Sequence, residues 1–131
     1  MQTLVTFVFK FLAALPLAWL HKLGNLLGSL GFRVLSKDRR RVFENMKLAG
    51  LNPTDEAVKK VFRETAKGGL ELPVAFFRRP EEIENLFVSV NGWEHVQTAL
   101  SAGEGLLFIT PHIGSYDLAG RYISQQLPFP L

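Results

Sequence analysis

The stretch GLLFITPHIGSYD, residues 105–117, joins an apolar run to a polar loop, and it is the part of the sequence that indicates the fold most directly. The run at residues 106–110 has the length and composition of a strand that is buried on both faces. A second β-rich run, LFVSV, occupies residues 86–90. The residues between the two runs carry apolar side chains at helical spacing and are too numerous for a hairpin. The sequence therefore predicts an α/β fold in which residues 81–131 contain a βαβ unit with parallel strands.

The loop after the second predicted strand carries a candidate catalytic pair, His112 and Asp117. In open α/β sheets, ligands bind beyond the carboxyl ends of the strands, which is the expected place of His112. If Ser115 caps the following helix, Asp117 lies in its first turn, and the loop can bring the two side chains within hydrogen-bonding distance. A histidine held by a carboxylate can act as a general base toward a hydroxyl, as acyl transfer to an alcohol requires. On spacing alone, a backbone-bonded histidine and a helix-start carboxylate remain the alternatives.

The preceding residues, 33–80, are predicted to form a basic and amphipathic helical region. Within it, Asn52 and Pro53 predict the start of a helix, with Asn52 as the cap and Pro53 at the first helical position. Apolar side chains at helical spacing carry this helix to about Lys67. The Gly-Gly pair at 68–69 is expected to bend or end it, and a second helical piece is expected after the pair.

Residues 1–32 form an apolar segment in which Lys10 is the one strongly polar side chain between Leu4 and Leu20. That stretch is slightly short for the hydrocarbon core of a bilayer, and Lys10 is costly to insert. Pro16 is expected to kink the segment, and the glycines at 24, 28 and 31 are expected to be flexible points. The segment is therefore predicted to be membrane-associated, either as a tilted span or as a helix that lies in the interface.

The charge of the chain is divided unevenly along its 131 residues. Residues 1–41 hold seven of the 15 Lys and Arg side chains but one of the 12 Asp and Glu side chains, although the whole chain is only +3. Most of these basic residues directly follow the apolar segment: Arg33, Lys37, Arg39, Arg40 and Arg41. Such a cluster attracts anionic lipid and marks the cytoplasmic side of a membrane. Membrane lipids are thus expected partners, and the residues after about position 33 are expected to be cytoplasmic.

Other classes of protein fit less well. A cleaved signal peptide is disfavoured because residues 1–3 contain no Lys or Arg, whereas a buried core helix with a solvated basic flank remains an alternative. The absence of cysteine excludes disulfides, thiolate zinc sites and cysteine nucleophiles. No nucleic-acid partner is expected, because the basic residues lie beside an apolar helix rather than among exposed aromatic side chains.

Four blocks in this order carry a resemblance to a known family. They are the apolar N-terminal segment, DRRRVFENM at residues 38–46, VNGWEHV at residues 90–96 and GLLFITPHIGSYD at residues 105–117. Together they resemble the late acyltransferases of bacterial lipid A biosynthesis, the lauroyl and myristoyl acyltransferases of the lysophospholipid acyltransferase-like superfamily. The resemblance covers essentially the whole chain. It implies that the βαβ unit is the first catalytic block of an acyltransferase domain and the start of an incomplete mixed sheet.

The resemblance also implies an activity. Such enzymes take a fatty acyl group from an acyl carrier protein thioester and transfer it to a hydroxyl of a lipid A precursor, without a metal or another cofactor. By this likeness, His112 is the general base and Asp117 orients it, at the cytoplasmic face of the bacterial inner membrane. Gly114, Ser115 and Tyr116 stand where the family usually has Gly-Asn-Trp, and they are assigned to substrate binding. Arg121 is a further substrate-binding candidate, with an intrahelical partner or a surface charge as its alternative role.

Family members are roughly twice as long as this chain, so the resemblance implies the N-terminal half of an enzyme. The expected division is an apolar membrane-associated segment at 1–32, a helical region at 33–80 and a truncated catalytic block at 81–131. The alternative function is a catalytically inactive membrane-binding remnant or interaction module of a truncated gene.

Overall fold

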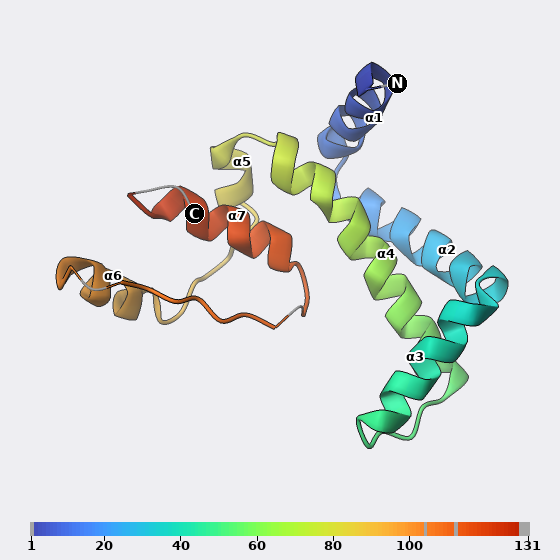
Figure 1. The fold of residues 1–131 in the computed structure, drawn as a ribbon. Helices are drawn as coiled ribbons and strands as arrows, with labels where there is room; N and C mark the ends of the chain where they lie inside the picture. Colours follow the sequence, from blue (N-terminus) through green and yellow to red (C-terminus); the bar gives the residue numbers. More distant parts are fainter. Residues whose placement is uncertain (1, 104, 112, 129–131) are drawn as a thin grey trace. The chain divides into compact units, whose positions relative to one another are not determined.

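The computed structural model describes residues 2–103, 105–111 and 113–128. The chain divides into two compact units, Met1–Arg78 and Arg79–Leu131. Helices α1 to α4 belong to the first unit and α5 to α7 to the second (Figure 1). Their bounds are α1 Gln2–Ala14, α2 Leu17–Val34, α3 Ser36–Leu48, α4 Asp55–Phe77, α5 Pro80–Glu84, α6 Trp93–Ser101 and α7 Tyr116–Gln126.

The apolar N-terminal segment forms two helices rather than one. The break falls at Leu15 and Pro16, so the kink expected at Pro16 is confirmed. Proline lacks the N–H that a continuous helix needs, and its ring clashes with the preceding turn. In the described part of the chain, no single helix has both the length and the apolar character to cross a membrane. The stretches Thr3–Ala14 and Leu17–Val34 reach the required length and apolar character only when they are taken together, and the chain bends by 116° between them.

Helices α2 and α4 pack along each other in antiparallel directions, at very short range (Figure 1). A Cβ added to Gly28 would lie 2.4 Å from Cα of Arg63, and one added to Gly24 would lie 2.9 Å from Cα of Lys67. The expectation that these glycines are flexible points is wrong, because they are the places where the two backbones approach. Near the other end of the contact, Nε2 of His21 lies 2.6 Å from Oε1 of the buried Glu71.

Helix α4 differs from the prediction at both ends. Its N-cap is Thr54, whose hydroxyl accepts a hydrogen bond from the amide of Ala57 at 3.2 Å, so Asn52 is not the cap. The helix also continues through the Gly-Gly pair at 68–69 and through Pro73. Pro73 and its neighbours Val74 and Ala75 are buried, and this burial offsets the lost hydrogen bond and the low helix propensity of glycine.

Hydrogen bonds connect the end of α4 to the end of α1. Nε of Arg78 donates to the carbonyl of Ala13 at 2.8 Å, and Nη2 donates to the carbonyl of Leu15 at 2.7 Å. The last carbonyls of a helix have no intrahelical partner, so the guanidinium satisfies two groups that the break at Pro16 leaves free. The rings of Phe9 and Phe77 meet edge to face beside this contact, with centroids 6.3 Å apart.

The second unit contains no strand among its described residues, so the α/β prediction is wrong. Neither the βαβ unit nor the start of a mixed sheet is present, because residues 86–90 and 106–110 form no strand. Val88 is fully exposed, and Leu107 and Ile109 are 85% and 87% exposed. A buried strand needs a neighbouring strand for its backbone groups and a layer on each face for its side chains. The apolar composition of the runs did not show whether they had these neighbours.

Candidate functional site

The loop that leads into α7 carries most of the site residues predicted from the sequence. Gly114 has a φ of +66°, a conformation that residues with a side chain rarely adopt, and it turns the chain toward the helix. Ser115 occupies the N-cap position, as expected. Its side chain makes no capping hydrogen bond, whereas its carbonyl accepts from the amide of Ala119 at 3.0 Å.

Of the predicted catalytic pair, Asp117 can be placed. It lies half-buried in the first turn of α7, where the positive end of the helix dipole favours a carboxylate. Tyr116 precedes it as the first residue of the helix. His112 lies outside the described residues, so its pairing with Asp117 stays a prediction.

Arg121 lies one helical turn beyond Asp117. No ion pair joins these two described side chains, although their spacing would permit one. Nε of Arg121 is instead buried without a hydrogen-bond partner among the described groups. A buried guanidinium N–H without an acceptor is costly, and carboxylate or phosphate oxygens are the acceptors that a guanidinium binds best.

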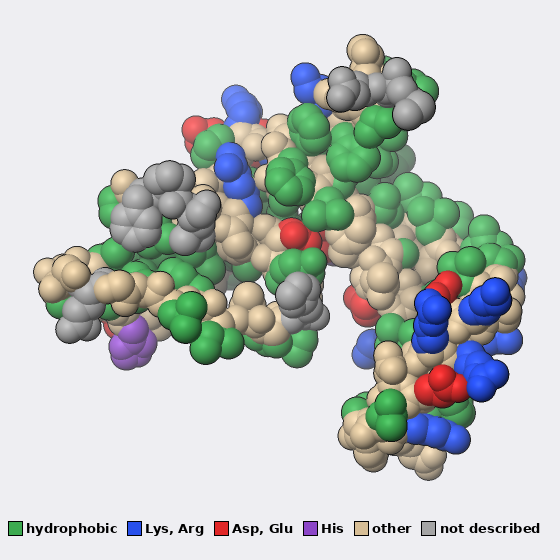
Figure 2. Space-filling model, in the orientation of Figure 1, with side chains coloured by type: hydrophobic (Ala, Val, Ile, Leu, Met, Phe, Trp, Pro, Cys, Tyr) green, Lys and Arg blue, Asp and Glu red, His purple; other side chains and the backbone are tan. Residues whose placement is uncertain are grey.

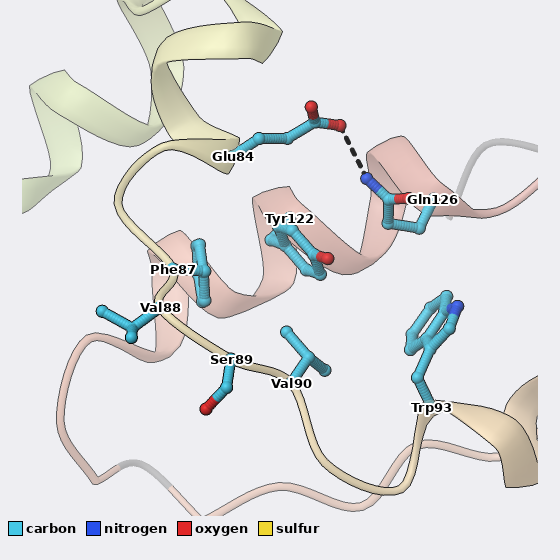
Figure 3. Close-up of a pocket in the computed structure, with 8 residues that line it drawn as sticks. All are labelled: Glu84, Phe87, Val88, Ser89, Val90, Trp93, Tyr122 and Gln126. Carbon is cyan, nitrogen blue, oxygen red and sulfur yellow. Dashed lines mark hydrogen bonds between the residues drawn. The ribbon is translucent and has the colours of Figure 1, made fainter.

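A cavity of about 430 Å³ lies in the second unit, and the sequence did not point to it (Figure 3). Its walls come from the end of α5, the segment after it, the first residue of α6 and the C-terminal half of α7. The lining residues are Glu84, Phe87, Val88, Ser89, Val90, Trp93, Tyr122 and Gln126.

The cavity combines aromatic walls with one polar edge. The ring of Tyr122 lies 4.4 Å from that of Phe87 and meets that of Trp93 edge to face at 6.5 Å. At the polar edge, Nε2 of Gln126 donates to Oε1 of Glu84 at 2.8 Å (Figure 3). Such a surface can hold an apolar chain or the apolar face of a sugar ring and bond to its hydroxyls. The signal in the sequence was three aromatic residues spread over 36 positions, from 87 to 122, which only the fold brings together.

Potential metal ligands do not cluster in the described part of the chain. No group of three or more His, Asp or Glu side chains there could hold a metal ion.

Comparison with known protein families gives a match over nearly the whole chain. No curated protein and no solved structure matches the chain. The family model for bacterial lipid A biosynthesis acyltransferases matches residues 1–129, a range that includes the loop before α7, the half-buried Asp117 and the N-terminal helices α1 and α2. Because the match extends over nearly all of its 131 residues, this chain belongs to the bacterial lipid A biosynthesis acyltransferases.

Proposed function

We propose that the chain serves the transfer of a fatty acyl group from an acyl carrier protein thioester to a hydroxyl of a lipid A precursor. His112 is the general base of this proposal, and Asp117 orients it. The observation that carries the proposal is the family match across residues 1–129, which includes both residues. The position of Asp117 in the first turn of α7, five positions after His112 in the sequence, also supports it.

The proposed acyl transfer accounts for every proton and every bond without a metal ion. One imidazole nitrogen of His112 takes the proton of the acceptor hydroxyl, and the oxygen attacks the carbonyl carbon of the thioester. The carbon–sulfur bond then breaks, and the leaving thiolate takes the proton back from the imidazolium. Asp117 accepts a hydrogen bond from the second ring nitrogen and stabilises the positive charge that forms in between.

The acceptor contacts are proposed around the same loop. Gly114, Ser115 and Tyr116 are within a few residues of His112 along the chain and are assigned to the acceptor. Arg121 is assigned to a phosphate of the lipid A precursor, because a guanidinium binds phosphate oxygens well and Arg121 lies one helical turn beyond Asp117.

The proposed location is the cytoplasmic face of the bacterial inner membrane. The acceptor is a membrane lipid and the donor is carried by a soluble protein, so the reaction requires a catalyst at the boundary. The exposed apolar side chains of α1 and α2 and the basic residues after α2 support this location.

The test is an acyl-transfer assay on the full chain with acyl carrier protein thioester and a lipid A precursor. His112→Ala and Asp117→Asn are expected to lower turnover by about a hundredfold or more, since each removes part of the general base. His95→Ala is the matched control, because His95 is 86% exposed on α6 and has no role in the proposal. Near-normal turnover in His112→Ala would contradict the mechanism. Absence of turnover in the folded wild-type chain would favour the inactive membrane-binding module instead.

A further inference from the structure

Helix α2 presents three different faces along its length. One face packs on α4 and contains the buried residues Leu20, Gly24 and Gly28. A second is polar, with residues at successive spacings of three, four and four positions: Lys22, Asn25, Ser29 and Arg33. The third is apolar and exposed, and it consists of Trp19, Leu26, Leu27, Leu30 and Val34. With 3.6 residues per turn, each set forms one stripe along the helix.

Helix α1 also exposes large apolar side chains. Five large apolar side chains there are between 43% and 68% exposed: Leu4, Val5, Phe7, Val8 and Phe11. These residues and the exposed apolar stripe of α2 are called the apolar face below. A soluble monomer rarely exposes so many large apolar side chains on neighbouring helices, and such a surface usually marks a contact with a partner or a membrane.

The packing of α2 against α4 decides how this surface can meet a membrane. The part of α4 that lies along α2 carries charged side chains, among them Arg63, Lys67 and Glu71. Nε of Arg63 there donates to the hydroxyl of Ser29 at 2.9 Å, and Lys67 packs against Gly24. If α2 crossed the hydrocarbon core, it would carry these charges and its own polar stripe with it, which is strongly unfavourable. If α2 lies in the interface, only its apolar stripe enters the acyl region, and α4 stays on the water side.

Helix α3 supplies charge next to the apolar face, because one residue separates it from α2. It has no buried residue, and Arg40 and Arg41 are 81% and 75% exposed. Arg40 donates a hydrogen bond to Glu44, which raises the pKa of the Arg40 guanidinium. Figure 2 shows basic side chains gathered over α3 and hydrophobic ones over α2. Basic side chains beside an exposed apolar surface fit anionic lipid headgroups.

We propose that α1 and α2 lie in the plane of an anionic phospholipid bilayer on one side of it. The apolar face enters the boundary between headgroups and acyl chains, and α3 binds anionic headgroups. The proposal rests on the membrane location given under the proposed function, and it adds that the bent helix pair neither spans the bilayer nor inserts as a re-entrant loop.

The depth of Trp19 tests the proposal. Trp19 lies near the middle of the pair formed by α1 and α2, so a spanning or re-entrant pair would place it near the bilayer centre. The full chain has two tryptophans, and Trp93→Phe leaves Trp19 as the single tryptophan, whose fluorescence can be excited selectively. This variant is bound to vesicles of phosphatidylglycerol and phosphatidylethanolamine that carry bromine near either the carbonyl end or the methyl end of the acyl chain. We expect stronger quenching by the shallow bromine.

A pair of variants tests the surface itself. Leu26→Asn with Leu30→Asn changes exposed positions of the apolar face and is expected to weaken vesicle binding by at least about tenfold. Leu107→Asn with Ile109→Asn is the matched control at two exposed apolar residues of the second unit, outside the apolar face and α3, and it is expected to bind as the wild type does. Circular dichroism checks that both variants keep their helices. If the Leu26→Asn, Leu30→Asn variant fails to fold, the depth of Trp19 in the Trp93→Phe chain still tests whether α1 and α2 lie in the plane of the bilayer.

Two other outcomes of these experiments would each overturn the proposal. Stronger quenching by the deep bromine overturns the in-plane arrangement but leaves the membrane location intact. Absence of vesicle binding, with a defined dimer in solution, assigns the apolar face to a second copy and removes the membrane location as well. Neither result depends on acyl transfer, so the catalytic proposal stands or fails in its own assay.

Discussion

Gly28 shows how a single residue sets the distance between two helices. An added Cβ at this position would lie 2.5 Å from the carbonyl oxygen of Phe62, as well as against the backbone of Arg63. Because the neighbouring atoms belong to the backbone, they cannot move aside as a flexible side chain would. Gly28→Ala is expected to lower the free energy of unfolding by about 1–3 kcal/mol, the usual cost of overpacking.

Thermal unfolding of Gly28→Ala beside Gly68→Ala measures this effect. Gly68 lies inside α4 with no atom within 4 Å of an added Cβ. Alanine there is expected to raise stability by about 0.5–1 kcal/mol, because it is the better helix former. If both variants were equally stable, the close approach of α2 and α4 would be wrong.

At the scale of the element, α4 holds the first unit together through its end as well as its face. Arg78 bonds to the carbonyls of Ala13 and Leu15, so the guanidinium fixes α1 at the break before α2. Arg78→Gln is expected to weaken the hold on α1 by about 2 kcal/mol, the range for hydrogen bonds to a charged group. Amide hydrogen exchange should therefore become faster in α1 while α2, which packs along α4, stays protected.

Arg79 provides the control for this change. It is the next residue in the sequence, its side chain is 79% exposed, and it pairs with Glu82 within its own turn. Arg79→Gln should leave exchange in α1 unchanged. Equal exchange in α1 of the Arg78 variant and the wild type would show that the hydrophobic contacts alone hold the helix.

At the scale of the whole molecule, the uneven charge predicts how binding to vesicles depends on salt. Residues 1–41 carry the positive excess, whereas the rest of the chain holds more acidic than basic side chains. Raising the ionic strength from about 0.1 M to about 1 M shortens the Debye length from about 10 Å to about 3 Å. Affinity for phosphatidylglycerol vesicles should fall several-fold and then level off, because the apolar face contributes a part that salt does not screen.

Two comparisons check this prediction in a vesicle co-sedimentation assay. Binding to vesicles of phosphatidylcholine should change little with salt, since these lipids carry no net charge. Arg40→Gln with Arg41→Gln should reduce the salt dependence on anionic vesicles without changing the part that remains at high salt. Salt-independent binding to anionic vesicles would contradict the role given to α3.

The sequence predicted the local features of the first unit because short-range physics controls them. The break at Pro16 follows from the missing N–H of proline, and the apolar character of α1 and α2 is a property of composition. The sequence placed the start and the length of α4 wrongly. The Gly-Gly pair at 68–69 and Pro73 disfavour a helix locally, yet packing of α4 as a whole against α1 and α2 outweighs that preference.

The candidate site was predictable in part. Helix α7 begins directly after Ser115, and Asp117 lies in its first turn, because a polar residue before an amphipathic stretch is a strong start signal. The aromatic cavity was not predictable, since Phe87, Trp93 and Tyr122 meet only through the arrangement of α5, α6 and α7. The orphan Nε of Arg121 likewise depends on burial that no local pattern encodes.

The sequence by itself determined the apolar and basic N-terminal region, the break at Pro16 and the membership of the lipid A acyltransferase family. These depend on composition, local geometry and the order of residues. The tertiary structure alone decided that residues 86–90 and 106–110 form no strands, since pairing depends on neighbours distant along the chain. It also decided that α2 packs one face on α4 and leaves another exposed, because the facing surface determines which apolar side chains are buried.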